Sequence, residues 1–479
     1  MIRHPTDTLP LQTFMSNLPE PADLNKNALG LTESVIMGVA GTAPVFSIAA
    51  TSATLVAAVG VLAPASLLYC GLIMFGVTFA YMYLNRLDAN AGASYAWVGS
   101  IFNRSLGFLC GWALLVASAL FMVSGTIPAA TATLELIDPA DINNTGIVAL
   151  VAAAWLIAVS AVVLKGIKLT SYVQVTLTFV ELAILIVIVG TALLKFGAHP
   201  AHLMQLSAFS LTRFNPHLFT AGALTAVFFY WGWDVTVNLN EETRNGSRVA
   251  SLGSLLAMLF IIALFMLFAI VALMALSDQE IQAANANIVF AIAEKLFPKP
   301  WSYMAILAVM LSTLGTLETS ILQFTRTMFA QSRDGLLHHR YAHLHPTWDT
   351  PWIATLVITL FGLALLLLAS FIPSVNQIIQ DSVDAIGFQA SFYYGLACLA
   401  CVWHVWRTQP KTPFNVIFLI LWPLGSALFL WFIGIYSLPT FSATVNTIAI
   451  GGVVLGLVPF WLNRNKAIPT SQPQPVSML

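Results

Sequence analysis

Charge is what this sequence has least of. Only 8% of its 479 residues are Asp, Glu, Lys or Arg, whereas soluble domains carry about 25%. Hydrophobic residues make up 58% of the chain, and the mean hydropathy is +0.85. Such a chain has too little charge to cover the surface of a soluble protein of this length. The composition therefore predicts a polytopic membrane protein.

Cysteine is also scarce, and the motifs of common enzymes are missing. The four cysteines, Cys70, Cys110, Cys398 and Cys401, all lie in apolar runs and match no His/Cys cluster. We therefore expect neither a disulfide framework nor a zinc site. The sequence has no GxxxxGKS, GxxxxGKT, HExxH or GxSxG motif, which argues against ATP coupling within this chain and against a membrane-embedded enzyme. No catalytic residue, metal or cofactor is expected.

Long apolar runs follow a polar start. Residues 1–27 contain four prolines and lack the apolar core of a cleavable signal peptide, so we interpret them, and residues 466–479, as cytoplasmic tails. Between the tails, windows of about 20 apolar residues, the length that crosses a bilayer, predict twelve helices. Their ranges are 31–60, 62–84, 104–132, 144–164, 168–195, 217–240, 249–276, 300–332, 352–371, 375–405, 413–436 and 441–463.

Basic residues are unevenly divided between the two sides of these helices. With both termini inside, fifteen of the 19 Lys and Arg residues are cytoplasmic and four are outside. The four are Lys195, Arg213, Lys295 and Lys299. This bias follows the positive-inside rule. We expect a multi-pass protein of the cytoplasmic (inner) membrane with both termini in the cytoplasm.

Two predicted helices are interrupted. The first contains GVAGTAPVFSIAA (residues 38–50), and the sixth contains FFYWGWDVTVNLNEET (residues 228–243). Paired broken helices in equivalent positions of two halves point to a transporter substrate site, because freed backbone groups cannot face lipid and must line a protein-walled cavity. The expected substrate-binding residues are Gly38, Gly41, Thr42, Ala43, Tyr230, Trp231, Gly232, Trp233 and Asp234.

The two breaks have different chemistry. Amides near Thr42 and Ala43 would offer a positive helix end to a substrate carboxylate, and carbonyls before the break would face an ammonium. Glycine and proline are also common in membrane helices, where they simply let helices pack closely. Asp234 at membrane depth weighs against packing alone, because a mid-membrane charge costs about 2.5–3.5 kcal/mol.

Four segments in order carry a resemblance to a known family. They are the break at residues 38–50, AGASYAWVGSIFNRSLGFLCGW (residues 91–112), residues 228–243, and TRTMFAQSRDGLLHHRYAHLHPTWDTP (residues 325–351). With them the chain resembles the amino acid, polyamine and organocation transporter superfamily over nearly its whole length. The resemblance implies an all-α fold with a five-plus-five inverted repeat in a core at residues 28–410, peripheral eleventh and twelfth helices at residues 411–465, and alternating access around a central site.

Departures from the family pattern concern charge. Residues 41–44 read GTAP where many amino acid carriers have Gly-Ser-Gly, and the proline has no amide hydrogen to donate. Glu181 stands where proton-coupled relatives carry a lysine, and Glu318 stands where relatives often have asparagine. We interpret Glu181 as the primary proton carrier and Glu318 as its modulator, with the alternative that Glu318 only pairs with a donor such as Thr170 or Ser171.

Two further polar groups are weighed against structural roles. Asp384, with Asp381 close by in sequence, is assigned to an outer vestibule, although a purely structural carboxylate at a helix end remains an alternative. The pair Glu241 and Glu242 is expected at the inner end of the sixth helix. The histidine-rich loop (residues 338–345) has no carboxylate framework and is interpreted as solvated rather than metal-binding.

The sequence as a whole favours a secondary transporter. An ion channel would need a selectivity filter or a ring of charges, and neither is present. The expected substrate is an amino acid or a related organic amine, moved by alternating access with proton coupling. A polyamine or other organic cation permease or exchanger is the alternative, because the buried acidic groups suit a cation. The expected partners are the substrate, protons and lipid, and no nucleic acid.

Overall fold

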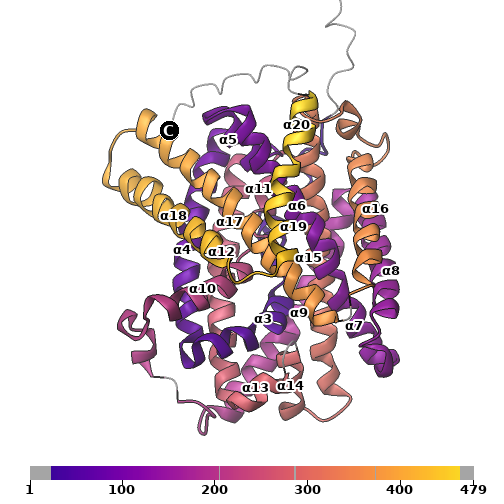
Figure 1. The fold of residues 1–479 in the computed structure, drawn as a ribbon, viewed down its shortest axis with the longest axis vertical. Coiled ribbons are helices and arrows are strands. Elements are labelled where there is room, and N and C mark those ends of the chain that lie inside the picture. The colour runs from indigo at the N-terminus through magenta and orange to yellow at the C-terminus, as the bar shows by residue number, and fades with distance from the viewer. Residues whose placement is uncertain (1–22, 204, 285–286, 373, 464–479) are drawn as a thin grey trace, which may run out of the picture.

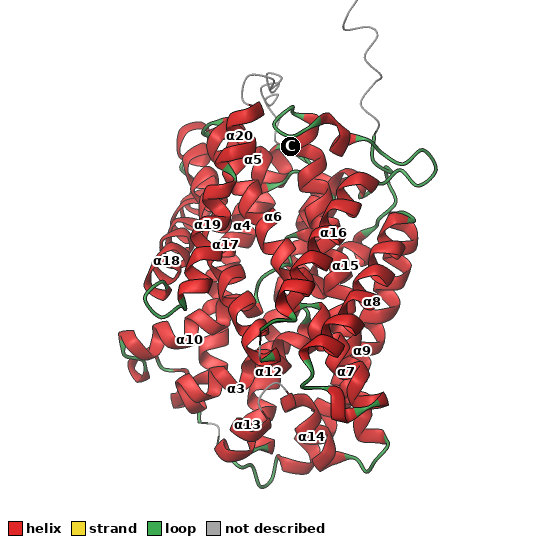
Figure 2. Ribbon diagram, turned by 45° about the vertical axis from the view of Figure 1, so that its right-hand side comes forward, coloured by secondary structure: helices red, strands yellow, loops and turns green. Residues whose placement is uncertain are grey.

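The computed structural model describes residues 23–203, 205–284, 287–372 and 374–463. Within these ranges the regular elements are helices and no strand occurs (Figure 2). The helical class expected from the sequence is confirmed. Most of the two expected cytoplasmic tails, residues 1–22 and 464–479, lies outside the described residues.

The helices run mainly along the long axis of the molecule (Figures 1 and 2). Helices α5 and α20 lie at one end, called here the α5/α20 end. Helices α13 and α14 lie at the other, the α13/α14 end. The bounds are α2 Leu31–Gly41, α3 Pro44–Val59, α4 Ala63–Leu87, α5 Ser94–Ile101, α6 Arg104–Ser124, α7 Thr126–Ile137, α8 Thr145–Leu164, α9 Ile167–Phe196, α10 Pro216–Phe229, α11 Val235–Asn238, α12 Gly246–Ala275, α13 Asp278–Ala284, α14 Ile288–Leu296, α15 Met304–Arg333, α16 Trp352–Ala369, α17 Val375–Thr408, α18 Trp422–Ser437, α19 Ala443–Leu455 and α20 Leu457–Asn463.

Local sequence explains many helix starts. The side chains of Asn103, Asn144 and Ser442 accept hydrogen bonds from backbone amides in the first turns of α6, α8 and α19. These are the residue types that best satisfy the free amides at a helix start. Pro44 and Pro64 stand in the first turns of α3 and α4, where proline costs no helix hydrogen bond.

Ten stretches of the described residues are long and apolar enough to cross a membrane. One of them, Leu31–Leu87, is 57 residues long and contains α2, α3 and α4. As one straight helix it would span about 85 Å, far beyond a hydrocarbon core of roughly 30 Å. Helix α10 has only 14 residues and ends at the second interruption. Twelve crossings, and the inverted repeat, therefore stay predictions.

Helix α15 is central to the bundle. Within its most apolar 18-residue stretch 78% of the residues are buried, against 17% for the stretch at Ala443–Asn463. It packs against α9, α7 and α6, while α4 packs on α12 and α17 on α6 and α18. The buried face of α15 is rich in hydroxyl and amide side chains, including Ser312, Thr316 and Gln323. These polar groups reach the two helix interruptions.

Candidate functional site

The first interruption, here the first break, is residues 42–43 between α2 and α3. Ala43 adopts a left-handed conformation with φ 47°, which ends α2 and lets α3 begin at Pro44. The amides of Thr42 and Ala43 donate to the carbonyls of Val39 at 3.2 Å and Ala40 at 3.0 Å. In this conformation these two amides are therefore not free donors for a substrate carboxylate.

The side chain of Ser312 on α15 occupies the positive end of α3. Its hydroxyl oxygen accepts from the amide of Val45 at 3.1 Å and, at 3.4 Å, from that of Phe46. One turn along α15, the Thr316 hydroxyl donates to the Ala40 carbonyl at 2.5 Å. Helix α15 thus satisfies backbone groups on both sides of the first break, as groups at membrane depth require.

The second break, residues 230–234, separates α10 from the short helix α11. Gly232 lies there with φ 101°, a conformation that favours glycine. A Cβ on Gly41 would lie 2.2 Å from the Gly232 carbonyl oxygen, and a Cβ on Gly232 would lie 2.1 Å from that of Gly41. The two breaks are in direct backbone contact, and only glycine fits at either position.

Gly38 has a packing role. A Cβ there would lie 2.7 Å from the Cβ of Ala257 on α12 and 2.9 Å from the Thr236 methyl group. Close helix packing, the alternative considered for the glycines of the first break, therefore accounts for this position.

Asp234 is held by two tyrosines of α17. Its side chain is 1% exposed, and its carboxylate accepts from the hydroxyls of Tyr394 at 2.8 Å and Tyr393 at 3.3 Å. The indole of Trp231 donates to the Tyr393 oxygen at 3.0 Å, and the amide of Gly232 donates to the Tyr394 oxygen at 3.4 Å. The second break is thereby fastened to α17 as well as to the first break.

Sequence reasoning missed Tyr393 and Tyr394. The available signal was two adjacent phenol groups in an apolar run, because a buried tyrosine hydroxyl needs a partner. Aromatic rings complete the surroundings of the second break. Trp233 stacks on Tyr394 with ring centroids 6.0 Å apart, and Tyr81 contacts both rings edge-on. This tight aromatic packing leaves the indole nitrogen of Trp233 buried without a hydrogen-bond partner.

Glu181 on α9 connects to the first break through one residue. It is 1% exposed, and the Ser312 side chain is the polar group recorded as interacting with its carboxylate, whose Oε2 has no hydrogen-bond partner. Because Ser312 also accepts from Val45 and Phe46, a single hydroxyl links Glu181 to the start of α3.

Glu318 is equally buried but stands apart. Its side chain is 1% exposed and its Oε1 has no partner. No contact with Glu181 is recorded among the described residues, and Glu318 lies six residues, about 9 Å, along α15 from Ser312. The hydroxyls of Thr170 and Ser171 donate to the carbonyls of Gly166 at 2.9 Å and Lys168 at 3.1 Å instead. The structure thus records no partner for Glu318 in either of the two expected arrangements.

Two cavities flank α3. The larger, about 350 Å³, is bordered by α3, α7, α14, α15 and the start of α17, and its wall includes Phe46. The smaller, about 150 Å³, contains Asp384, which accepts from the Gln380 amide at 3.0 Å, together with Thr51, Thr54 and Phe228. Phe46 and Phe228 meet edge-to-face at 6.5 Å. Of the expected substrate-binding residues, none is in the wall of either cavity in this conformation.

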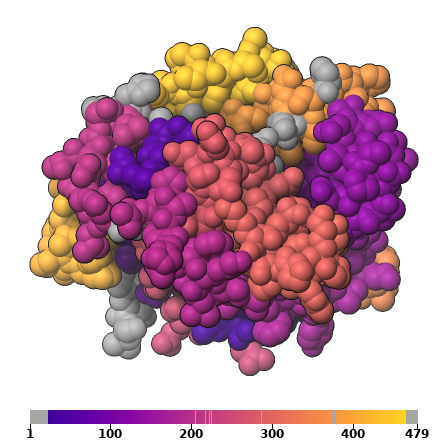
Figure 3. Space-filling view, turned by 90° about the horizontal axis from the view of Figure 1, so that it is seen from below, coloured from indigo at the N-terminus to yellow at the C-terminus, as the bar shows by residue number. Residues whose placement is uncertain are grey.

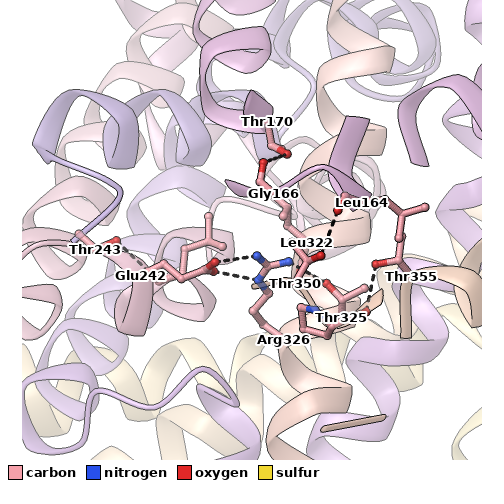
Figure 4. A network of polar contacts seen from close by, with 12 residues as sticks. Leu164, Gly166, Thr170, Glu242, Thr243, Leu322, Thr325, Arg326, Thr350 and Thr355 are labelled. Carbon is pink, nitrogen blue, oxygen red and sulfur yellow. Dashed lines mark hydrogen bonds and ion pairs between the residues drawn. The ribbon is translucent and has the colours of Figure 1, made fainter. Parts of the chain in front are cut away.

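Towards the α5/α20 end, α15 is fastened to the segment after α11. Arg326 and Glu242 are 0% exposed and form a bidentate pair with N–O distances of 2.9 and 2.8 Å (Figure 4). Arg333 and Glu241 form a second bidentate pair with side chains 26% and 21% exposed. Both glutamates follow α11 and each has a guanidinium partner, while their expected place at the inner end of the sixth helix stays a prediction.

The neighbouring carboxyl of Asp334 has a shifted pKa. Burial raises its pKa above the ordinary value, while the hydroxyl of Tyr95, donating at 2.8 Å, opposes the shift.

In the histidine-rich loop, the rings of His338 and His339 stack with their centroids 4.4 Å apart. No group of three or more potential metal ligands occurs among the residues that the structure describes.

The sequence profile of the family described as "Amino acid permease" matches residues 28–460, nearly the whole chain. The chain belongs to that family. It is therefore a transmembrane transporter of the amino acid, polyamine and organocation superfamily and not an enzyme. The resemblance inferred from the sequence is confirmed.

The individual relatives have low sequence identity to this chain, but the similarity extends over most of its length. The serine/threonine exchanger SteT of Bacillus subtilis is 24% identical over 64% of this chain and 67% of its own length. The human Asc-type amino acid transporter 1 is 24% identical over 82% of this chain and 74% of its own. The low-affinity putrescine importer PlaP of Escherichia coli is 24% identical over 69% of this chain and 71% of its own.

Proposed function

We propose that this permease is a secondary active transporter that moves amino acids or related organic amines across the cytoplasmic membrane by alternating access. The observation that carries the proposal is the backbone contact between the two breaks at Gly41 and Gly232. Two interrupted helices that meet at membrane depth form the kind of centre at which transporters hold substrate. This range of substrates is supported by the relatives, which include a serine/threonine exchanger, an amino acid transporter and a putrescine importer.

The membrane arrangement follows from the distribution of charge. We place the α13/α14 end outside and the α5/α20 end, with both termini, in the cytoplasm, because this puts most Lys and Arg inside. Twelve crossings result when Leu31–Leu87 is divided into two and α10 with α11 is counted as one. The transport core is residues 28–410, and residues 411–465 form two peripheral helices.

The substrate site comprises the two breaks. Their close contact makes this conformation one in which the centre is collapsed, and substrate entry requires the two glycines to separate. The carbonyl ends of α2 and the charge of Asp234 then face the substrate ammonium. The start of α3 faces the carboxylate once the Ser312 hydroxyl is displaced. Trp231, Trp233 and Tyr230 wall the site, and Asp384 belongs to the outer vestibule.

Proton coupling runs through Glu181. A proton on this buried carboxyl changes the charge one hydroxyl away from the amides of Val45 and Phe46. Protonation therefore alters the attraction between α9, α15 and α3, and a ligand that favours one conformation shifts the populations of both. Glu318 modulates this step by its charge, at longer range than a direct contact.

Uptake into proteoliposomes tests the proposal. A panel of labelled amino acids and polyamines is compared with and without internal substrate and with and without an inward proton gradient. We expect concentrative uptake of at least one compound that depends on the gradient. Uptake that needs internal substrate and ignores the gradient would replace symport by exchange, and flux of small inorganic ions without saturation would contradict a carrier.

The competing candidate is a polyamine or other organic cation permease. It is favoured by the carboxylates in the two cavities, Glu135 and Asp384, and by the absence of a Lys or Arg among the residues described in their walls. The same panel distinguishes it, because putrescine would then outcompete every zwitterionic amino acid.

A further inference from the structure

One charged side chain is found among the described residues in the wall of the larger cavity. The described wall of this cavity includes Phe46, Ala49, Ala132 and Phe290, which are apolar, and the polar groups Asn143 and Asn287. Glu135, at the end of α7, is the one charged residue in that wall. A volume of about 350 Å³ lies within the range of small-molecule sites, roughly 300–1,000 Å³.

The cavity is open towards the α13/α14 end and buried towards α3. Asn143 and Asn287 at its rim are exposed, whereas Phe46, Ala49 and Ala132 are buried. From the α13/α14 end, the surface of α13 and α14 (salmon) lies beside that of residues near 130–150 (purple; Figure 3). The buried part of the cavity wall lies close to the first break. Phe46 lines it, and the amide of Phe46 donates to the Ser312 side chain at the start of α3.

Glu135 has no recorded hydrogen bond or ion pair among the described residues, although three pairs of charged groups at the same end are formed. Lys295 lies 2.7 Å from Glu280, Lys299 lies 3.7 Å from Glu294, and His202 lies 3.1 Å from Asp278. The basic side chains nearest in sequence to the cavity wall are thus committed elsewhere. The carboxylate of Glu135 is the group in this wall that still lacks a counter-ion.

The chemistry of the cavity wall favours ligands of positive charge. A carboxylate attracts an ammonium ion and repels another carboxylate, and the faces of Phe46 and Phe290 add cation–π attraction for a ligand that reaches them. The side-chain oxygens of Asn143 and Asn287 can accept from an ammonium group. The cavity with Asp384 differs, because there Gln380 already donates to the carboxylate.

We infer that the cavity beside α3 is an entry site for organic ammonium ions, held by Glu135 before they reach the breaks. The inference rests on the proposed function, since it takes the α13/α14 end as external and the breaks as the destination. It specifies the ligand class as an alkylammonium group, whether of an amine or of an amino acid, and gives the cavity no affinity for a free carboxylate.

Binding to the purified full-length protein in nanodiscs is measured by ligand-observed NMR titration. The probes are n-butylammonium and butyrate, which share a chain and differ in charge. Wild type should bind n-butylammonium in preference to butyrate. Glu135→Gln should weaken n-butylammonium binding about 3- to 10-fold, the effect of one partly solvated charge, and Glu135→Lys should reverse the preference.

Glu294→Gln is the matched control, because it removes one carboxylate at the same end without touching the cavity wall. It should leave n-butylammonium binding unchanged. Equal affinity in wild type and Glu135→Gln, or equal binding of the two probes to wild type, would overturn the inference.

Uptake assays separate this result from the proposed function. If Glu135 acts at entry, Glu135→Gln raises KM for an amine substrate and leaves the maximal rate unchanged. If wild type takes up substrate and Glu135→Gln has the same KM, the entry site is contradicted and the proposed transport function stands. If the protein binds n-butylammonium in preference to butyrate but takes up no compound of the panel, the ammonium site is supported and the proposed transport function is contradicted.

Discussion

Gly41 and Gly232 touch through their backbones, so that a Cβ on either residue would lie 2.1–2.2 Å from the carbonyl oxygen of the other. They are 191 positions apart in sequence and belong to the two interrupted helices. Their contact joins the two breaks into one centre.

Substitution of Gly41 by alanine tests this contact. A methyl group placed 2.2 Å from the Gly232 oxygen must push the breaks apart, and such overpacking costs about 1–3 kcal/mol. Gly41→Ala should lower the thermal unfolding midpoint in detergent, and Gly41→Val should lower it further while still inserting into the membrane. Gly190→Ala, on a face with open space, is the control, and an unfolding midpoint for Gly41→Ala equal to the control would rule out the contact.

Asp234→Asn should weaken binding of cationic and zwitterionic substrates by about 1.5–3 kcal/mol, the worth of a charge-assisted hydrogen bond. Tyr394→Phe should act in the same direction but less, because it removes a donor 2.8 Å from the carboxylate and keeps the charge. Tyr436→Phe, an exposed site on α18, is the control. Substrate affinity is measured by competition in the uptake assay, and unchanged affinity in Asp234→Asn would limit this residue to a structural role.

Replacement of the two buried glutamates tests coupling. Glu181→Gln should flatten the dependence of uptake on pH, because the exchangeable proton is lost. Glu318→Gln should shift the midpoint to lower pH, since one negative charge fewer makes proton loss from Glu181 easier. Ser312→Ala should uncouple uptake from the gradient at constant pH, because it removes the link to α3. Wild-type pH profiles in both glutamine variants would mean that the proton is carried elsewhere.

The two Arg–Glu pairs near the α5/α20 end should differ in energy. Loss of one partner from the fully buried pair Glu242–Arg326 leaves an uncompensated charge and costs about 3–5 kcal/mol. Loss of one partner from the Glu241–Arg333 pair should cost less, because side chains that are 26% and 21% exposed leave the remaining charge in contact with solvent. Thermal unfolding of Glu242→Gln and Glu241→Gln compares them directly, and equal losses would contradict the burial of Arg326.

The helical class and most of the membrane helices could be predicted from the sequence, because a membrane helix is an apolar run of a fixed minimal length. The breaks were found because GTAP (residues 41–44) and the Gly232 segment interrupt such runs. The number of membrane crossings was harder to predict. Helix α10 is too short to cross a membrane alone, and α2 to α4 form one continuous apolar stretch.

Contacts between distant helices could not be predicted. Nothing local tells that Tyr393 and Tyr394 hold Asp234, or that Ser312 caps α3, because each pairing depends on how helices far apart in sequence pack. The buried carboxylates were found by their depth, but their partners were not. Glu135 carries no signal in the sequence, because a charge in the last turn of an apolar helix is ordinary.

Counterflow in proteoliposomes tests most directly whether the joined breaks form an alternating substrate site. Vesicles preloaded with unlabelled substrate transiently accumulate external label only when one site faces the two sides in turn. We predict counterflow of the substrate found in the uptake panel for wild type and Gly190→Ala, and none for folded Gly41→Ala. Counterflow in Gly41→Ala equal to that of wild type would contradict the account.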